Sequence, residues 1–418
     1  MIIEIPAFSL VALIGVSGSG KTTFAQTHFE PTEIISSDAC RALICDDPDN
    51  QKVTKDAFDL LFMIANKRLS MGRLVLIDAT SVEAFARRKL IDLARRHRAR
   101  SVAIVLDLPE ACCRARARDR RERPLGAEII AKQAELLRQS LPTLRQEGFD
   151  AVHVLTSSHM VDEVKLIRRP VPSNRRDDFG PFDIIGDVHG CYDELVALLR
   201  TLGYEVDADE AHPNAFHPEG RRAIFLGDLV DRGPKIPAVL RLVMSMVDRD
   251  QALCILGNHD DKLRRALEGS PVERTHGLKE SLCQLEATSI PFIHRVHRFI
   301  EGLVSHYVLD RGRLVVAHAG LKASLQGLDS KRARSFALYG DPTGTTDDDG
   351  RPIRRDWAAD YHGRALVVYG HTPVRTPRWT NASLCIDTGC VFGGALSAMR
   401  YPEQNVVSVK ARRMYWKR

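Results

Sequence analysis

A glycine-rich segment close to the start of the chain carries a lysine and a threonine at the spacing used by phosphate-binding loops. Residues 15–22 read Gly-Val-Ser-Gly-Ser-Gly-Lys-Thr and fit the pattern G-x-x-x-x-G-K-[ST]. Glycines let the backbone N–H groups turn toward phosphate oxygens, while Lys21 is expected to act on the β and γ phosphates and Thr22 to hold Mg²⁺. The pattern predicts binding of ATP or another NTP with Mg²⁺ through Gly15, Ser17, Gly18, Ser19, Gly20, Lys21 and Thr22.

An acid and an arginine follow the next apolar run. Asp38 comes directly after Ile34-Ile35-Ser36-Ser37, near the end of a predicted strand, and Arg41 lies about one helical turn later. A carboxylate there can accept the proton of an attacking hydroxyl, and a guanidinium can bind a phosphate of the acceptor. The alternative interpretation makes Asp38 a helix N-cap and Arg41 an exposed side chain.

An arginine-rich run at residues 114–123 supplies a third element of this first site. Arg116 and Arg120 are four residues apart and share one face of a predicted helix. Paired guanidinium groups can cover the transferring phosphoryl group as a lid. Such a run is often only a solvated helix face, but the phosphate-binding loop upstream favours the lid.

Five short blocks in the second half of the chain combine carboxylates, imidazoles and an amide. Each block follows an apolar run that resembles a strand, so the polar side chains are expected on loops at strand ends, where they can converge. In chain order the blocks contain Asp187 and His189, then Asp228, Asp231 and Arg232, then Asn258 and His259, then His318, and finally His371.

This donor set suits two divalent ions such as Mn²⁺ or Ni²⁺. Asp187 and His189 are expected to hold one ion, Asn258, His318 and His371 the other, and Asp228 is expected to bridge them. Two ions roughly 3.5–4 Å apart can activate water and clamp a phosphate for in-line attack. Arg232 is expected to bind the phosphate oxygens, and His259, oriented by Asp231, to protonate the leaving oxygen.

The elements that must position these residues can be outlined from hydrophobic periodicity. Residues 10–14, 33–35, 74–77, 102–106 and 151–155 are short apolar runs separated by amphipathic stretches, which predicts a doubly wound parallel sheet. The pattern breaks at a charged, proline-punctuated segment and resumes with strand-like runs at 182–185, 223–226, 253–256, 314–317, 365–369 and 383–386. The predicted organisation is a phosphotransferase domain at 1–170, a linker at 171–181 and a phosphoesterase domain at 182–418.

Composition limits the classes of protein to consider. The net charge of +6 is compatible with an anionic substrate but is too small for a histone-like nucleic-acid binder. No apolar run approaches the roughly 18 residues that span a membrane, and the first residues lack a signal-peptide pattern, so we expect a cytoplasmic protein. The nine scattered cysteines are expected to be reduced and mostly buried.

The motifs resemble two known families. The blocks from Asp187 to about Asp387 resemble calcineurin-type metallophosphoesterases, in the branch with serine/threonine phosphatases and diadenosine tetraphosphatase. The loop, Asp38 with Arg41, and the arginine run resemble polynucleotide 5′-kinases. Together their order is similar to that of the bacterial polynucleotide kinase-phosphatases of RNA end-healing and repair, which implies a P-loop kinase sheet followed by an αββα sandwich.

The resemblance also implies functional roles for individual residues. It implies that Asp38 is the general base, that Arg41 grips the acceptor phosphate and that Arg116 and Arg120 form the lid; the alignment at Arg123 can shift within the arginine run. The family's larger members continue into a ligase module, but no lysine-centred ligase motif is visible. Either another enzyme seals the ends or the chain is truncated, and the sequence does not decide between these.

The function expected from this resemblance is nucleic-acid end healing. The first module would phosphorylate the 5′-OH of RNA or DNA ends, and the second would remove 3′- or 2′-phosphates, including those from 2′,3′-cyclic phosphates. A separate ligase and a second copy of the chain in a homodimer are the candidate protein partners, and no membrane is expected. Two alternatives stay open: a nucleoside or small-molecule kinase fused to a dinucleotide polyphosphatase, and a serine/threonine protein phosphatase with an NTP-binding regulatory module.

Overall fold

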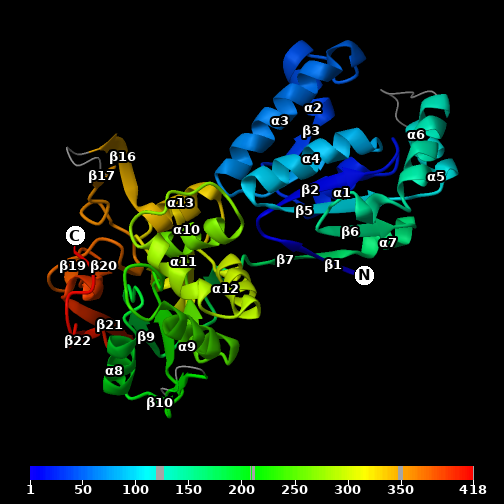
Figure 1. Cartoon of the computed structure of the whole chain (residues 1–418). Helices are drawn as coiled ribbons and strands as arrows, with labels where there is room; N and C mark the ends of the chain where they lie inside the picture. The colour runs from blue at the N-terminus through cyan, green and yellow to red at the C-terminus, as the bar shows by residue number, and fades with distance from the viewer. Residues whose placement is uncertain (119–126, 208, 210–211, 347–351, 418) are drawn as a thin grey trace. The chain divides into compact units, whose positions relative to one another are not determined.

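The computed structural model describes residues 1–418 except 119–126, 208, 210–211, 347–351 and 418, and it divides the chain into two compact units (Figure 1). Unit 1 comprises Met1–Val171 with Leu328–Arg332, and unit 2 comprises Pro172–Gly327 with Ala333–Arg418. Of the helices in the described part of the chain, none has both the length and the apolar character that crossing a bilayer requires. The nine cysteines are free thiols, and six of them are buried.

Unit 1 is built on a parallel sheet with the strand order β3-β4-β2-β5-β6. The strands are β2 (Ser9–Ile14), β3 (Ile34–Ser36), β4 (Val75–Asp78), β5 (Arg100–Leu106) and β6 (Ala151–Leu155). Each lies within two residues of a predicted apolar run, because strands covered on both faces are apolar throughout. A separate parallel pair joins β1 (Ile2–Pro6) to β7 (Lys165–Arg169).

Helices cover both faces of this sheet (Figure 1). Leu10 and Ala12 of β2 belong to an apolar cluster that includes residues of α3, α4 and α6, whereas Val11 and Leu13 pack with residues of α1. The side chains of one strand therefore alternate between two cores, which confirms the predicted doubly wound arrangement. The helices are α1 (Lys21–His28), α2 (Ser37–Cys45), α3 (Thr54–Ser70), α4 (Ala84–His97), α5 (Glu110–Arg118), α6 (Ala127–Ser140) and α7 (Ser158–Glu163).

Unit 2 is a sandwich of two mixed sheets, with strand orders β13-β12-β9-β21-β22 and β19-β20-β18-β15-β14-β8. Buried residues of both sheets, among them Ile184, Ile224, Val316 and Val368, form a single apolar cluster. The first sheet contains β9 (Phe182–Ile185), β12 (Arg222–Phe225), β13 (Ala252–Cys254), β21 (Ala395–Tyr401) and β22 (Asn405–Lys410). The second contains β8 (Asn174–Arg175), β14 (His306–Leu309), β15 (Leu314–Ala317), β18 (Leu366–Tyr369), β19 (Arg378–Thr380) and β20 (Ser383–Cys385).

The helices of unit 2 carry strong apolar faces, as sandwich-covering helices must. They are α8 (Tyr192–Leu202), α9 (Ile236–Asp248), α10 (Asn258–Leu267), α11 (Leu278–Glu286), α12 (Ile290–Gly302) and α13 (Lys331–Tyr339), the last of which belongs to this unit from Ala333 on. Two hairpins complete the unit: β10 (Glu205–Asp207) with β11 (Asn214–Phe216), and β16 (Asp341–Thr346) with β17 (Pro352–Arg355). The αββα sandwich expected for this half is thus present.

The linker predicted at 171–181 is wrong in part, because it contains strand β8. Asn174 and Arg175 pair in parallel with β14, and the Val308 N–H donates to the Ser173 carbonyl at 2.8 Å. The Arg175 guanidinium also lies 5.7 Å from the centre of the Tyr307 ring. Backbone pairing and this cation–π contact hold a polar segment in the sheet without an apolar face of its own.

Candidate functional site

The phosphate-binding loop of unit 1 connects β2 to α1. Gly18 has a φ of 82°, and a Cβ at this position would collide with the Cys113 carbonyl oxygen, so the loop requires glycine there. The side chain of Lys21 is buried against the loop, where its Nζ donates to the carbonyl oxygens of Gly15 at 2.8 Å and Val16 at 2.9 Å. The ammonium is therefore fixed at the N-terminal end of α1, where backbone N–H groups and the helix dipole favour phosphate.

A carboxylate not identified from the sequence lies beside the loop. Thr22 Oγ1 donates to Asp78 Oδ2 at 2.8 Å, and Asp78 is the last residue of β4, the strand adjacent to β2. A hydroxyl with a nearby strand-end carboxylate is the usual setting for Mg²⁺ in such loops. The available signal was a carboxylate placed directly after Val75-Leu76-Ile77.

Asp38 and Arg41 form an ion pair at the start of α2. The N-cap of this helix is Ser36, whose Oγ accepts the Asp38 N–H at 3.2 Å, so Asp38 is not the cap. Arg41 is only 7% exposed, and its Nε donates to the Pro48 carbonyl at 2.7 Å. The alternative of a capping aspartate with an exposed arginine is therefore wrong.

The residues of this site share one cavity of about 330 Å³, which is lined by the loop together with Asp38, Arg41 and Asp78. A larger cavity of about 720 Å³ shares five of these lining residues: Thr54, Phe58, Thr80, Ile129 and Gln133. Gln133 of α6 accepts the Ser17 N–H at 2.8 Å, a contact that no sequence motif indicated. Two cavities thus adjoin beside the phosphate-binding loop.

Of the two arginines predicted to form the lid, the structure describes the position of Arg116. The Arg116 Nη1 lies 3.6 Å from the position that a Cβ on Gly20 would occupy, and Nη2 donates to Ser158 Oγ at 2.9 Å. Arg116 therefore lies next to the phosphate-binding loop. Arg120 and Arg123 lie outside the described residues.

Unit 2 brings its five motif blocks together at the ends of its strands. Asp187 and His189 follow β9, Asp228 follows β12, Asn258 and His259 begin α10 after β13, His318 follows β15, and His371 follows β18. These loops have an unusual backbone: His189, Asp228, Asp231, Arg232 and His371 have φ values of 42°, 48°, 71°, 70° and 70°. Non-glycine residues seldom adopt positive φ, and such strain concentrates at functional sites.

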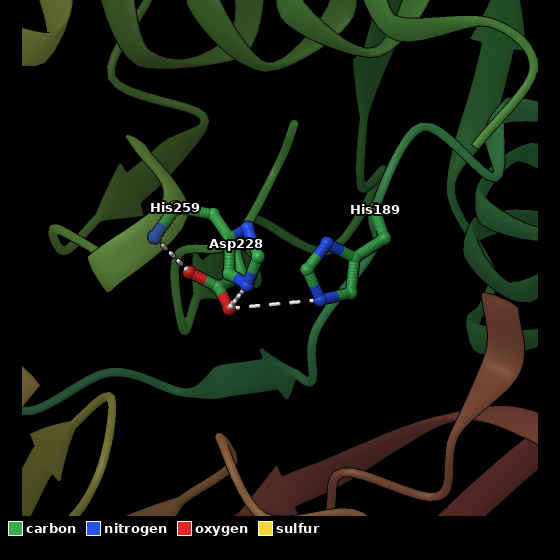
Figure 2. A group of neighbouring side chains, drawn as sticks. All are labelled: His189, Asp228 and His259. Carbon is green, nitrogen blue, oxygen red and sulfur yellow. Dashed lines mark hydrogen bonds and ion pairs between the residues drawn. The ribbon is translucent and has the colours of Figure 1, made fainter. Parts of the chain in front are cut away.

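Asp228 belongs to two groups of side chains able to hold a metal ion. In the first, shown in Figure 2, ligand atoms of His189, Asp228 and His259 all lie within 4.8 Å of one another. In the second, Asp228 is joined in the same way by His318 and His371. Asp228 Oδ2 lies 3.6 Å from His189 Nε2 and 3.4 Å from His318 Nε2. One carboxylate thus faces both groups, as the bridging role requires.

The hydrogen bonds of the imidazoles fit metal ligation. His189 Nδ1 lies 2.7 Å from the Val230 carbonyl and His318 Nδ1 lies 3.0 Å from the Leu226 carbonyl, so each Nδ1 carries the proton and donates. Each Nε2 is then an acceptor near the acceptor oxygen of Asp228, and a cation fits between two such groups. Burial lowers the pKa of His318 to about 4, which keeps the imidazole neutral as a ligand must be, and raises that of Asp228 to about 8, a shift that a divalent cation would reverse.

Asn258 lies within the group formed by Asp228, His318 and His371, whereas Asp187 contacts only the backbone of that group. Asn258 Oδ1 is 2.9 Å from His318 Nε2 and 2.8 Å from His371 Nδ1. Asp187 accepts the His371 N–H at 3.1 Å and is not among the ligand atoms that gather within 4.8 Å. Burial raises its pKa well above the usual value, and Asp387 and Asp228 add to the shift. Asp387, which follows β20, is therefore a further acid of the site that sequence analysis did not single out.

Arg232 connects the metal-binding groups to the predicted acid. Its Nη1 lies 2.8 Å from His189 Nε2 and its Nη2 lies 2.8 Å from His259 Nε2. His259 Nδ1 lies 2.6 Å from Asp231 Oδ2, the contact that the predicted orienting role requires. Ser281 Oγ donates to Asp231 Oδ1 and accepts the Asp231 N–H at 2.9 Å. Ser281 lies in α11, outside every motif, and nothing local in the sequence indicated its role.

Comparisons with known proteins match both halves of the chain. The family described as AAA domain matches residues 10–142, and the calcineurin-like phosphoesterase family matches residues 180–395. The bis(5′-nucleosyl)-tetraphosphatase PrpE [asymmetrical] of Bacillus subtilis is 47% identical over 232 residues, which cover 54% of this chain and 93% of that protein. The protein of that name from Anoxybacillus flavithermus is 44% identical over 238 residues, which cover 56% and 96%.

A crystal structure of a putative diadenosine tetraphosphatase is 26% identical, with a TM-score of 0.43, and the match covers 57% of this chain and 96% of that one. Calcineurin-like phosphoesterases use divalent metals, and the donor groups around Asp228 fit such ions. Through residues 180–395, preceded by an AAA-type kinase-like domain, the chain belongs to the calcineurin-like phosphoesterase family.

Proposed function

We propose that unit 2 hydrolyses phosphoanhydride bonds of nucleoside polyphosphates, with dinucleoside tetraphosphates as the main substrate class. The observation that carries this proposal is the position of Arg232, which contacts His189 of a metal-binding group and the orienting pair His259–Asp231 at once. The PrpE relatives, named as asymmetrical bis(5′-nucleosyl)-tetraphosphatases, support this substrate class over the polynucleotide ends expected from the sequence resemblance.

The residues of unit 2 divide the reaction among them. Divalent ions held by Asp228, His189, Asn258, His318 and His371 would supply an activated water nucleophile and neutralise phosphate charge, which leaves His259 free for proton transfer. Arg232 binds non-bridging phosphate oxygens through its two Nη groups. His259 gives a proton to the leaving phosphate oxygen, while Asp231 holds Nδ1 and stabilises the imidazolium. The water oxygen bonds to phosphorus, and the bond from phosphorus to the bridging oxygen breaks.

We further propose that unit 1 transfers the γ-phosphate of an NTP to a hydroxyl acceptor. Lys21 and Thr22 with Asp78 form the donor side, and Asp38 lies in the same cavity as a carboxylate able to take the acceptor's proton. Arg116 beside Gly20 adds positive charge near the transferring group. If unit 2 is a dinucleotide polyphosphatase, the acceptor that we propose for unit 1 is a small hydroxyl compound such as a nucleoside.

A specific observation keeps polynucleotide end healing as a second candidate. Arg41 is buried in the cavity beside Asp38, where its guanidinium can bind a phosphate that the acceptor carries. The adjoining 720 Å³ cavity is lined by Lys55, Lys89 and Lys132 against Asp59 and Glu83, together with aromatic side chains, so its charged lining has a small positive excess. Under this candidate, unit 2 would remove 3′- or 2′-phosphates from the same ends, and RNA or DNA would be the partner.

One substrate comparison tests these candidates. The Mn²⁺-loaded protein is incubated in turn with a dinucleoside tetraphosphate, with an oligonucleotide bearing a 3′-phosphate and with a serine/threonine phosphopeptide, and kcat/KM is measured for each. We expect the dinucleoside tetraphosphate to have the highest kcat/KM. A higher kcat/KM for the oligonucleotide would instead support end healing, and a higher kcat/KM for the phosphopeptide would support the protein phosphatase alternative.

A further inference from the structure

A cavity of about 430 Å³ lies in unit 2 where three segments meet. The segment after His371 contributes Pro373 and Arg375, the segment after Asp387 contributes Thr388 and Phe392, and residues near the end of the chain contribute Met414 and Trp416. Two of these segments therefore begin at polar residues of the site described above. The volume is within the range of pockets that bind small organic ligands.

Phe392 connects this cavity to the phosphoesterase site. The Arg232 guanidinium lies 5.3 Å from the centre of the Phe392 ring, and the same guanidinium contacts His189 and His259. The cavity and the phosphate-binding arginine are thus separated by one aromatic side chain. A ligand whose phosphates contact Arg232 would place its next chemical group at Phe392 or beyond it.

The segment that carries Trp416 is held in place by hydrogen bonds. The Tyr415 and Trp416 N–H groups both donate to the Val391 carbonyl at 3.0 Å, and the Tyr415 hydroxyl donates to Glu194 Oε1 at 2.8 Å. Trp416 is itself only partly exposed. The backbone that carries the indole is therefore held before any ligand binds, which reduces the entropy lost on stacking against Trp416.

The composition of the cavity favours a planar, phosphate-bearing ligand. Phe392 and Trp416 supply aromatic faces, and Arg375 supplies a positive charge, while no carboxylate is present among the described residues that line the space. Three lining residues, at 389, 393 and 394, are glycines and add no side chain to the space. Nucleobases stack on aromatic side chains regardless of base identity.

We propose that this cavity is the nucleoside subsite of the phosphoesterase, in which a nucleobase stacks on Trp416 and Phe392 while the attached phosphates extend to Arg232. This proposal rests on the proposed function in that the substrate is built from nucleotides. The nucleobase can come from a dinucleoside polyphosphate or from the last nucleotide of a polynucleotide end. The shared requirement is a nucleoside linked to phosphate, and the two sources are separated by the test.

Fluorescence supplies a readout of binding that does not depend on turnover. The chain has three tryptophans: Trp357 is buried, Trp379 lies exposed on β19, and Trp416 lines the cavity. A non-hydrolysable dinucleoside tetraphosphate analogue added to the metal-loaded protein is expected to quench tryptophan emission. The quenching should be lost in Trp416→Phe and retained in Trp379→Phe, the matched control. Quenching that persists in Trp416→Phe, or no quenching in the wild type by this analogue or by an oligonucleotide bearing a 3′-phosphate, would overturn the proposal.

A second test measures the kinetics of Trp416→Ala. Trp379→Ala is the control, and the melting temperature of each variant checks that it is folded. We expect the ratio of kcat/KM for the nucleotide substrate to kcat/KM for inorganic tripolyphosphate, which lacks a base, to fall about tenfold, mainly through KM. An equal fall for both substrates, or an unchanged ratio, would overturn the subsite. If the wild type hydrolyses 3′-phosphate oligonucleotides but not dinucleoside tetraphosphates, the proposed function fails, and the same ratio measured with the oligonucleotide decides the subsite.

Discussion

His259 Nδ1 lies 2.6 Å from the Asp231 carboxylate, while Nε2 of the same ring lies 2.8 Å from Arg232. This relationship fixes both nitrogens of the imidazole, one toward a buried acid and the other toward the guanidinium that would bind phosphate. Since Nδ1 donates to Asp231, Nε2 accepts from Arg232 when no substrate is bound, and it is the atom left to face the leaving oxygen once Arg232 binds phosphate.

The first prediction concerns this ring. His259→Ala should lower kcat by roughly 10²–10⁴-fold on a dinucleoside tetraphosphate, because a positioned general acid contributes on that scale. On a phosphate ester with a good leaving group such as p-nitrophenol, the loss should be much smaller, since that oxygen needs no proton to depart. Steady-state kinetics on both substrates checks this, and equal losses on both would contradict the acid role.

Arg232 should not be replaceable by lysine. Arg232→Lys keeps the charge, but a single ammonium cannot contact His189, His259 and a phosphate as the forked guanidinium can. We expect kcat/KM for both Arg232→Lys and Arg232→Ala to fall by about 10- to 100-fold. Arg241→Lys, an arginine of α9 that stacks on Phe292 away from the motif blocks, is the matched control. Activity of Arg232→Lys close to wild type would show that charge alone suffices.

Lys21→Ala should abolish NTP-dependent phosphoryl transfer and leave the hydrolysis of dinucleoside tetraphosphate by unit 2 nearly intact. The reason is that Lys21 belongs to the phosphate-binding loop of unit 1, whereas the donor groups around Asp228 belong to unit 2. Radiolabel transfer from γ-labelled ATP and the hydrolysis assay, measured on one preparation, check the division. Comparable loss of both activities in a folded variant would count against it.

Arg41→Ala separates the two acceptors proposed for unit 1. If Arg41 binds an acceptor phosphate, its loss should reduce kcat/KM by about 10- to 100-fold on a 5′-OH oligonucleotide and much less on the matching nucleoside. Asp38→Asn should lower turnover on either acceptor by roughly 10²–10⁴-fold while NTP affinity is kept. An equal effect of Arg41→Ala on both acceptors would favour the small-molecule kinase.

Much of the fold was predictable because buried strands are continuous apolar runs. All five strands of the unit 1 sheet, and the strands leading to the motif blocks of unit 2, were found in this way. Strand β21 was not predicted, because its buried face includes Ser397, which is satisfied by hydrogen bonds of 2.7 Å with Thr388 and Ser408. Strand β8 has the sequence pattern of a linker, because its residues are polar and its pairing with β14 is remote in sequence.

The candidate site likewise contains residues that local sequence predicts and residues that only tertiary packing brings into place. Asp228, His189, His318 and His371 could be predicted because each follows an apolar strand in a short motif, and the structure gathers them. Ser281 could not be predicted, because its contact with Asp231 spans 50 residues of chain and is made by packing of α11. The burial of Arg41 and the contact of Phe392 with Arg232 likewise arise only when distant segments meet.

The most direct test of the central claim is product analysis of diadenosine tetraphosphate hydrolysis with and without divalent metal. Two groups of ligands that share Asp228 should make hydrolysis depend on a bound ion such as Mn²⁺ or Ni²⁺, and Ca²⁺, which prefers looser all-oxygen coordination, should restore it less well. We predict ATP and AMP as products in Mn²⁺, no products in chelator, and recovery on adding Mn²⁺ back. Equal hydrolysis in chelator, or no hydrolysis in Mn²⁺ by protein that cleaves a phosphopeptide, would contradict the account.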